Sequence, residues 1–146
     1  MAEMVEVGLK PEVLRTARAQ GRLILLPGTI AEIRAGTTKK GDPIATARVA
    51  AIQAVKDTPR ILPLCHPIPI TGVETGLSVE DDGVTATVTV STVYKTGVEM
   101  EALTAVSAAL LTVWDMIKYL EKDAGGQYPA TRIESVHVIE KVKATA

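Results

Sequence analysis

The sequence has few aromatic residues and almost no net charge. Only 3% of its 146 residues are aromatic, phenylalanine is absent, and 16 Lys and Arg residues balance 17 Asp and Glu residues. A surface that stacks nucleic-acid bases needs several exposed rings in a basic groove, so we expect no nucleic-acid partner. Because 47% of the residues are hydrophobic, the core must be built from Ala, Val, Ile and Leu.

The chain also lacks the usual signs of export, metal binding and membrane insertion. Its one cysteine, Cys65, cannot form an internal disulfide and leaves a structural zinc site short of thiolates. Glu3 and Glu6 interrupt any apolar leader. The longest nearly uncharged apolar run, residues 102–114, is shorter than the about 18 residues that suggest a membrane span. We therefore expect a soluble cytoplasmic protein without a metal site or membrane contact.

The first third of the chain predicts a strand and a short helix. The whole chain of 146 residues has the length of a single domain. Residues 15–25 alternate with period two, which favours a strand, although their Ala, Leu and Arg content leaves a helix from Pro11 open. Residues 27–34 predict a short helix closed by Gly36, and a polar loop follows over residues 37–41.

Prolines mark the next part of the chain. Asp42 followed by Pro43 predicts the start of a helix that runs to about Lys56, since the carboxylate can accept backbone N–H groups and proline suits the next position. Residues 60–71 are predicted to be extended, because a helix there is forbidden by Pro59, Pro63, Pro67 and Pro69.

The second half predicts a hairpin, a long helix and a last strand. Two alternating runs, residues 73–79 and 84–90, flank the Asp-Asp-Gly of residues 81–83, which is a strong hairpin signal. Residues 97–122 predict a helix whose middle is apolar on every side, so a second subunit is expected to supply part of its cover. With a final strand over residues 131–142, the element order predicts an α+β fold with a mainly antiparallel sheet covered by helices.

A basic loop, Lys39-Lys40-Gly41, leads into the helix that begins at Asp42. Free backbone N–H groups and the positive end of the helix dipole can hold phosphate at such a place, and the lysines add charge. The alternative is a solvated basic loop, and no complete Walker pattern is present.

Cys65 and His66 lie in the segment that is predicted to be extended. Adjacent side chains of an extended chain point to opposite faces, so these two are badly placed to act as nucleophile and base, and we discount thiol catalysis. His66 alone could bind substrate or move a proton near neutral pH, or it could be a structural residue.

Two carboxylates, Glu99 and Glu101, stand at the start of the long predicted helix. Residues two apart lie on opposite sides of a helix but on the same side of an extended chain. Their joint use therefore requires this stretch to precede the first regular turn. In the alternative interpretation, the two acids complement the helix N-terminus.

Asp115 and Lys118 lie three residues apart, and therefore on one face of the same helix. The pair is either a surface salt bridge of little energetic weight or a partly desolvated site. In the second case, burial beside Trp114 would raise the pKa of Asp115 while Lys118 lowers it. A carboxylate and an amine balanced in this way can exchange protons with a bound substrate.

Five strings, taken together and in this order, resemble one family. That family is cyclic pyranopterin monophosphate synthase, the C protein of molybdenum-cofactor biosynthesis, and the likeness runs from about Met4 to Lys141. The strings are KGD at residues 40–42, ATAR at 45–48, ILPLCHP at 61–67, KTGVEMEALT at 95–104 and WDMIK at 114–118.

The resemblance implies a ferredoxin-like fold and a lyase reaction without a redox cofactor. In that reaction (8S)-3′,8-cyclo-7,8-dihydroguanosine 5′-triphosphate is rearranged to a pterin, pyrophosphate is lost and a cyclic phosphate closes. A magnesium ion accompanying the triphosphate is left open. The resemblance further implies one catalytic domain over residues 1–146 and a homohexamer, a trimer of dimers, with sites between subunits.

The resemblance also assigns roles to residues of this chain. It implies that Asp115 is the acid/base, that Lys118 assists proton transfer or stabilises negative charge, and that Lys40 meets the phosphates or the opening ring. The implied substrate-binding residues are Leu64, Cys65, His66, Glu99, Met100 and Glu101. Further phosphate contacts are expected from Arg15, Arg18 and Lys141.

The sequence departs from the family in two places, and two other functions compete with this one. The family's Gly- and Ser-rich tail is replaced by the short tail of residues 142–146, and the stretch between Asp123 and Thr131 differs. A non-catalytic, nucleotide-binding regulatory oligomer explains the basic loop and the apolar helix but not the His and acid residues. A metal-dependent phosphohydrolase would use His66 with the acids.

Overall fold

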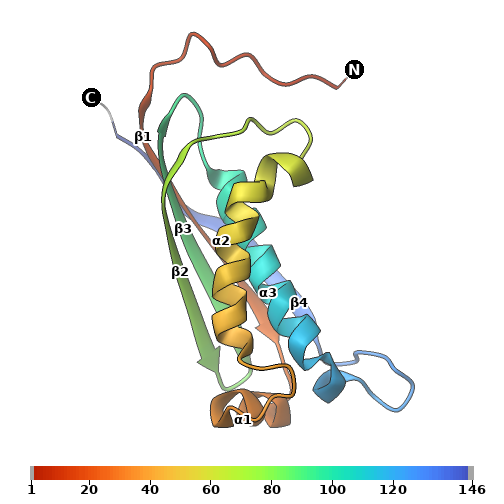
Figure 1. The fold of residues 1–146 in the computed structure, drawn as a ribbon. Coiled ribbons are helices and arrows are strands. Elements are labelled where there is room, and N and C mark those ends of the chain that lie inside the picture. Colours follow the sequence, from red (N-terminus) through yellow and green to blue (C-terminus); the bar gives the residue numbers. More distant parts are fainter. Residues whose placement is uncertain (1, 145–146) are drawn as a thin grey trace.

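The computed structural model describes residues 2–144 and contains a four-stranded antiparallel sheet with helices over one face (Figure 1). The sheet order is β2-β3-β1-β4, which confirms the predicted α+β, ferredoxin-like fold. The elements are β1 (Val13–Ile24), α1 (Pro27–Ala35), α2 (Pro43–Ile61), β2 (Ile70–Glu80), β3 (Gly83–Tyr94), α3 (Glu99–Glu121) and β4 (Arg132–Lys143).

Strand β1 lies in the middle of the sheet and pairs with both β3 and β4. Its alternation separates two environments, because Ala17, Ala19 and Leu23 are buried under the helices whereas Arg18 is exposed on the other face. The strand interpretation of residues 15–25 is therefore confirmed, and the alternative of a helix is wrong. Period two places every second side chain on the core side.

The end of α1 and the start of α2 agree with the sequence prediction. Gly36 closes α1 in the left-handed region, with φ of 72°. Asp42 caps α2, since its Oδ1 accepts hydrogen bonds from the backbone N–H groups of Ile44 at 3.0 Å and Ala45 at 3.2 Å. The polar segment between these caps forms the loop that was predicted over residues 37–41.

The end of α2 differs from the prediction. The helix continues beyond Lys56 to Ile61 with Pro59 inside it, because a proline near the end removes only its own N–H. The next turn still closes, with the backbone N–H of Leu62 donating to the carbonyl of Thr58 at 2.9 Å. A further turn follows, so only the part of residues 60–71 after Cys65 is extended.

The predicted hairpin is confirmed, and the last strand is shifted by one residue from its predicted bounds of 131–142. Strands β2 and β3 join through a two-residue loop, with Glu80 opposite Gly83 in the ladder. Strand β4 continues to Lys143 and so includes the start of the predicted tail 142–146. The backbone N–H of Ala144 donates to Leu14 at 2.9 Å, and residues 145–146 lie outside the described part of the chain.

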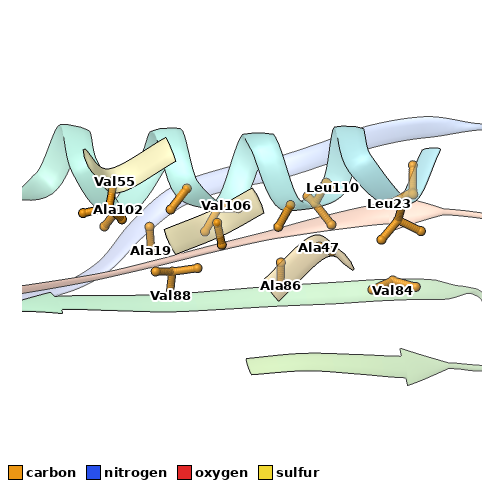
Figure 2. Packing of buried hydrophobic residues seen from close by; sticks show 14 of the residues in the cluster. Ala19, Leu23, Ala47, Val55, Val84, Ala86, Val88, Ala102, Val106 and Leu110 are labelled. Carbon is orange, nitrogen blue, oxygen red and sulfur yellow. The ribbon is translucent and has the colours of Figure 1, made fainter. Parts of the chain in front are cut away.

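The hydrophobic core lies between the sheet and helices α2 and α3 (Figure 2). Leu23 and Val88 of the sheet and Leu110 of α3 are completely or almost completely buried in it. Without phenylalanine the layers are filled by aliphatic side chains, and many of these are small. The alanines labelled in Figure 2 are Ala19, Ala47, Ala86 and Ala102.

Helix α3 is covered by the rest of the chain on one side only. Its length and composition would suit a membrane span, but half of that stretch is buried inside the molecule, as in the core helix of a soluble protein. Its outer side remains partly apolar, with Met100 and Leu111 exposing 43% and 56% of their surface. The predicted cover by a second subunit stays a prediction.

A buried carboxylate joins the end of α3 to the start of α1. Glu121 accepts hydrogen bonds from the backbone N–H of Leu26 at 3.0 Å and from the hydroxyl groups of Thr131, at 2.6 Å, and Thr29. Leu26 is the N-cap of α1 and has no side chain that can cap it. Glu121 therefore supplies the acceptor that the helix start requires, and fixes α1 relative to α3.

Candidate active site

Three predicted site residues meet near the C-terminal half of α3. The Lys118 Nζ lies 3.0 Å from the Asp115 Oδ1, as their spacing on one helix face predicts. The Lys40 Nζ comes from the loop between α1 and α2 and donates to the backbone carbonyl of Asp115 at 3.4 Å. We name Lys40, Asp115 and Lys118 the lysine–aspartate group. It places one cation on the Asp115 carboxylate and a second on the backbone carbonyl of the same residue.

The lysine–aspartate group is exposed, which decides between the two alternatives that the sequence left open. Solvent reaches 63% of the Asp115 side chain and 41% of the Lys118 side chain. The hydrogen bond and charge of Lys118, followed by the charge of Lys40, lower the pKa of Asp115. The pair is therefore the surface salt bridge, and not the partly desolvated site, of the two alternatives. Asp115 in turn raises the pKa of Lys118, so both groups are charged at neutral pH.

The basic loop can bind an anion through the charges of its lysines, but not through the backbone N–H groups at the start of α2. The Asp42 carboxylate already accepts the N–H groups of Ile44 and Ala45 at the start of α2. The expected phosphate site on free backbone N–H groups is thus occupied by the chain's own carboxylate. Lys39 and Lys40, both exposed, remain as the cations of this loop.

The other predicted site residues lie at the opposite end of α3. The Cys65 thiol donates to the Glu101 Oε2 at 3.7 Å. Glu101 is 1% exposed, and its Oε1 is buried without a hydrogen-bond partner among the described residues. An unpaired buried acceptor is costly, so this oxygen is suited to a ligand N–H or O–H donor.

Burial favours the protonated forms of Cys65 and Glu101 and so raises the pKa of both above those of free side chains. Burial first, and then the charge of Glu101, raises the pKa of Cys65 to about 11. Burial likewise raises the pKa of Glu101. Cys65 is therefore a thiol at neutral pH, which agrees with discounting thiol catalysis. The supporting geometry is a turn rather than the extended segment predicted, since the Cys65 N–H donates to Leu62 at 3.1 Å.

The two acids at the start of α3 have different partners. Both lie in the first helical turn, so the condition for their joint use is not met. Glu99 pairs with Lys141 of β4, with 3.3 Å between Oε1 and Nζ, whereas Glu101 turns inward to Cys65. The remaining predicted binding residues of this end are exposed Leu64 and Met100 and half-buried His66. We name this end of α3, with Cys65, Glu99, Glu101 and these three residues, the glutamate end.

The predicted phosphate contacts do not gather in one place within the chain. Arg15 donates to the backbone carbonyls of Tyr94 at 3.2 Å and Lys95 at 3.3 Å, close to the glutamate end. Arg18 donates to the Thr89 hydroxyl at 3.0 Å on the exposed face of the sheet. Side chains three apart on a strand face opposite sides, so only Arg15 shares the side of the helices.

The lysine–aspartate group and the glutamate end are far apart in one chain. Glu99 and Asp115 belong to the same helix, and a rise of 1.5 Å per residue separates them by about 24 Å. Figure 1 shows α3 as one continuous helix along the sheet. A small molecule cannot reach both groups of a single chain.

Two tyrosines beside Asp115 were not predicted as site residues. Tyr119 accepts a hydrogen bond from the backbone N–H of Lys39 at 2.9 Å, and the Lys39 Nζ lies 4.9 Å from its ring centre. Tyr128 packs edge-on against Trp114 at 5.3 Å. An open cavity of about 290 Å³ is lined by Leu111, Trp114, Asp115, Lys118 and Tyr128. The sequence did contain a signal for these residues: rings are scarce in the chain, and yet Trp114 and Tyr119 flank the Asp115–Lys118 pair.

Sequence comparisons connect this geometry to known proteins. The model of the MoaC family matches residues 4–144. Proteins named "Probable cyclic pyranopterin monophosphate synthase" from Thermococcus onnurineus and Thermococcus kodakarensis are 61% and 60% identical, over 97% of this chain and 90% of theirs. A protein of the same name from Methanoregula boonei is 56% identical over 97% of this chain and 92% of its own length.

Proposed function

The chain belongs to the MoaC family, and from that premise we propose that it forms cyclic pyranopterin monophosphate in molybdenum-cofactor biosynthesis. The observation that carries this function is an identity of 54–61% to synthases of that name over nearly the whole chain. The substrate is (8S)-3′,8-cyclo-7,8-dihydroguanosine 5′-triphosphate.

The reaction is a lyase reaction that releases pyrophosphate. A sugar oxygen attacks the α-phosphorus and closes the cyclic phosphate, while the bond to the β-phosphate breaks and pyrophosphate leaves. The guanine-derived rings are rearranged to the pterin through proton transfers. No electrons are gained or lost, so the chain's own acids and bases suffice for these steps.

The lysine–aspartate group performs the proton transfers. The lowered pKa of Asp115 keeps it ionised, so it accepts a proton. The raised pKa of Lys118 keeps it charged, so it donates a proton or stabilises negative charge that develops on the substrate. Lys40 adds a second cation against the phosphates or the opening ring. Before substrate binds, the Lys118 amine already contacts the Asp115 carboxylate and the Lys40 amine contacts the Asp115 backbone carbonyl.

The glutamate end binds the substrate. The buried, unpartnered Glu101 Oε1 is an acceptor for the N–H groups of the guanine-derived edge. Cys65 contacts Glu101 directly, and Leu64, His66, Glu99 and Met100 are the further substrate-binding residues proposed at this end. Phosphate contacts come from Arg15 and Lys141 on this side, and from Arg18 if another copy presents its exposed sheet face.

The site is shared between copies of the chain. The separation of about 24 Å along α3 requires that the glutamate end of one copy approach the lysine–aspartate group of another. The partly apolar outer side of α3, with Met100 and Leu111, is the surface for this contact. The assembly is a homohexamer built as a trimer of dimers, in which the whole chain acts as one cytoplasmic catalytic domain.

A turnover experiment tests this function against its two rivals. Purified protein is incubated with the cyclic triphosphate, and the products are measured as pterin fluorescence after oxidation and as released pyrophosphate. We expect both products. Binding without either product would support a regulatory nucleotide-binding protein. Tightly bound divalent metal together with chelator-sensitive phosphate release would support a phosphohydrolase.

A further inference from the structure

The loop that carries Lys40 is short, and among the described residues its hydrogen bonds to α3 come from the Lys39 backbone and the Lys40 side chain alone. It connects α1 to α2 and contains glycines with positive φ at both ends, 72° at Gly36 and 107° at Gly41. Within the loop, the Thr38 hydroxyl donates to the carbonyl of Gly41 at 2.6 Å. These bonds shape the loop but do not fix it against α3, where the lysine–aspartate group must form.

Tyr119 supplies the attachment to α3. Its hydroxyl oxygen accepts the backbone N–H of Lys39 at 2.9 Å, and the Lys39 Nζ lies 4.9 Å from its ring centre. Lys39 is the neighbour of Lys40 in the chain, so the bond places the backbone from which the Lys40 side chain starts. Tyr119 also follows Lys118 directly on α3. Residues 115–119 of α3 thus carry the Asp115 carboxylate, the Lys118 ammonium group and the Tyr119 hydroxyl that anchors the Lys40 loop.

We propose that Tyr119 is a positioning residue that holds Lys40 against Asp115. This inference rests on the proposed function, because it gives the anchor its use in the reaction. A lysine side chain is long and has many rotamers, so its charge is localised only when its backbone is fixed. Lys40 reaches the carbonyl of Asp115 at 3.4 Å from a loop 75 residues earlier in the chain.

The inference predicts a change in Lys40 that does not depend on turnover. Tyr119→Phe removes the acceptor but keeps the ring beside Lys39. In this variant we expect Lys40 to be acetylated severalfold faster by a limiting acylating reagent, measured by mass spectrometry. Exposed Lys56 on α2 serves as the internal reference. Tyr94→Phe is the matched control, because Tyr94 lies at the end of β3 and, within the part of the chain that the structure describes, its hydroxyl makes no hydrogen bond to the Lys40 loop or to α3.

The same variant is then assayed for turnover. We expect kcat of Tyr119→Phe to fall roughly tenfold, as a misplaced catalytic group causes, with little change in KM or in melting temperature. Acetylation of Lys40 at the wild-type rate would overturn the proposal, and so would faster acetylation with wild-type kcat. If wild-type protein forms no pterin, the proposed function fails, but the acetylation result still decides whether Tyr119 positions Lys40.

Discussion

At the residue scale, the Asp115–Lys118 pair combines exposure with defined geometry. Its atoms are 3.0 Å apart, yet solvent reaches much of both side chains. An exposed ion pair contributes little to stability. Stability therefore does not explain why a second cation, Lys40, comes to this pair from a distant loop. The proposed reaction supplies a functional reason, because in it the three groups together move protons beside a polyanionic substrate.

This difference between catalysis and stability is testable with Asp115→Asn. We expect kcat to fall by about 10² or more, since the loss of a general acid/base typically costs 10²–10⁴. The free energy of unfolding should change by no more than about 0.5 kcal/mol. Turnover and urea unfolding measure the two effects. Pterin formation at the wild-type rate would remove Asp115 from the mechanism.

A second prediction at this scale concerns the Cys65 thiol. Its pKa of about 11 lies above the ordinary value of 9.0, so the reactive thiolate appears only as pH rises toward 11. Alkylation by iodoacetamide should accordingly increase with pH beyond the range in which a free thiol is fully reactive. Glu101→Gln removes the neighbouring negative charge, and should shift this profile to lower pH.

The rate of Cys65 alkylation against pH, measured by mass spectrometry in both proteins, checks this prediction. Free cysteine in the same buffer is the control. Equal midpoints for the wild type and Glu101→Gln would show that the carboxylate does not act on the thiol. A midpoint below 9 in the wild type would contradict burial as the main cause of the shift.

At the element scale, close packing of α3 on the sheet depends on one glycine. A β-carbon at Gly21 would lie 2.8 Å from Val136 Cγ2, 2.9 Å from Val106 Cγ1 and 3.1 Å from Leu110 Cδ1. These atoms come from β4 and α3, so the glycine allows three elements to meet. The same approach fixes the direction of α3, along which the candidate site is spread.

We therefore expect Gly21→Ala to lower the free energy of unfolding by about 1–3 kcal/mol through overpacking. Gly28→Ala is the control, because a β-carbon there meets nothing within 4 Å. That change in α1 should be neutral or stabilise by up to about 1 kcal/mol. Urea unfolding of both variants measures the difference. Equal stabilities would mean that the packing around Gly21 relaxes without cost.

Local chemistry allowed most elements to be predicted from the sequence. Alternation gave β1, the Asp-Asp-Gly turn gave the hairpin, and Asp42 with Pro43 gave the start of α2. The end of α2 was missed because a proline stops a helix less strictly near its C-terminus, where few later N–H groups depend on it. Pro59 shows this, since Leu62 still closes the last turn.

The site was predictable to a different degree. The Asp115–Lys118 contact follows from helical spacing alone. Lys40 reaches Asp115 from 75 residues away, and only the family resemblance connected them. The sequence left the exposure of Asp115 open, because a mostly apolar run does not show which side of a helix its last residue faces. Tyr119 was missed because its partner is a backbone N–H, and backbone partners leave no pattern in the sequence.

At the scale of the whole molecule, the proposed site is divided between the two ends of one helix. The lysine–aspartate group and the glutamate end cannot meet within a chain. Two copies related by a two-fold axis could form two identical sites, each with one group from each copy. The partly apolar outer side of α3 then acquires a use, which is to bring the copies together.

Complementation between two defective variants tests this shared site most directly. One variant is Asp115→Asn, and the other combines Glu99→Gln with Glu101→Gln. A mixed pair has one site with all the changes and one site with none. After random co-assembly of equal amounts, we predict recovery of about one quarter of wild-type pterin formation, since half of the pairs are mixed. Activity no higher than that of the more active parent would contradict the shared site.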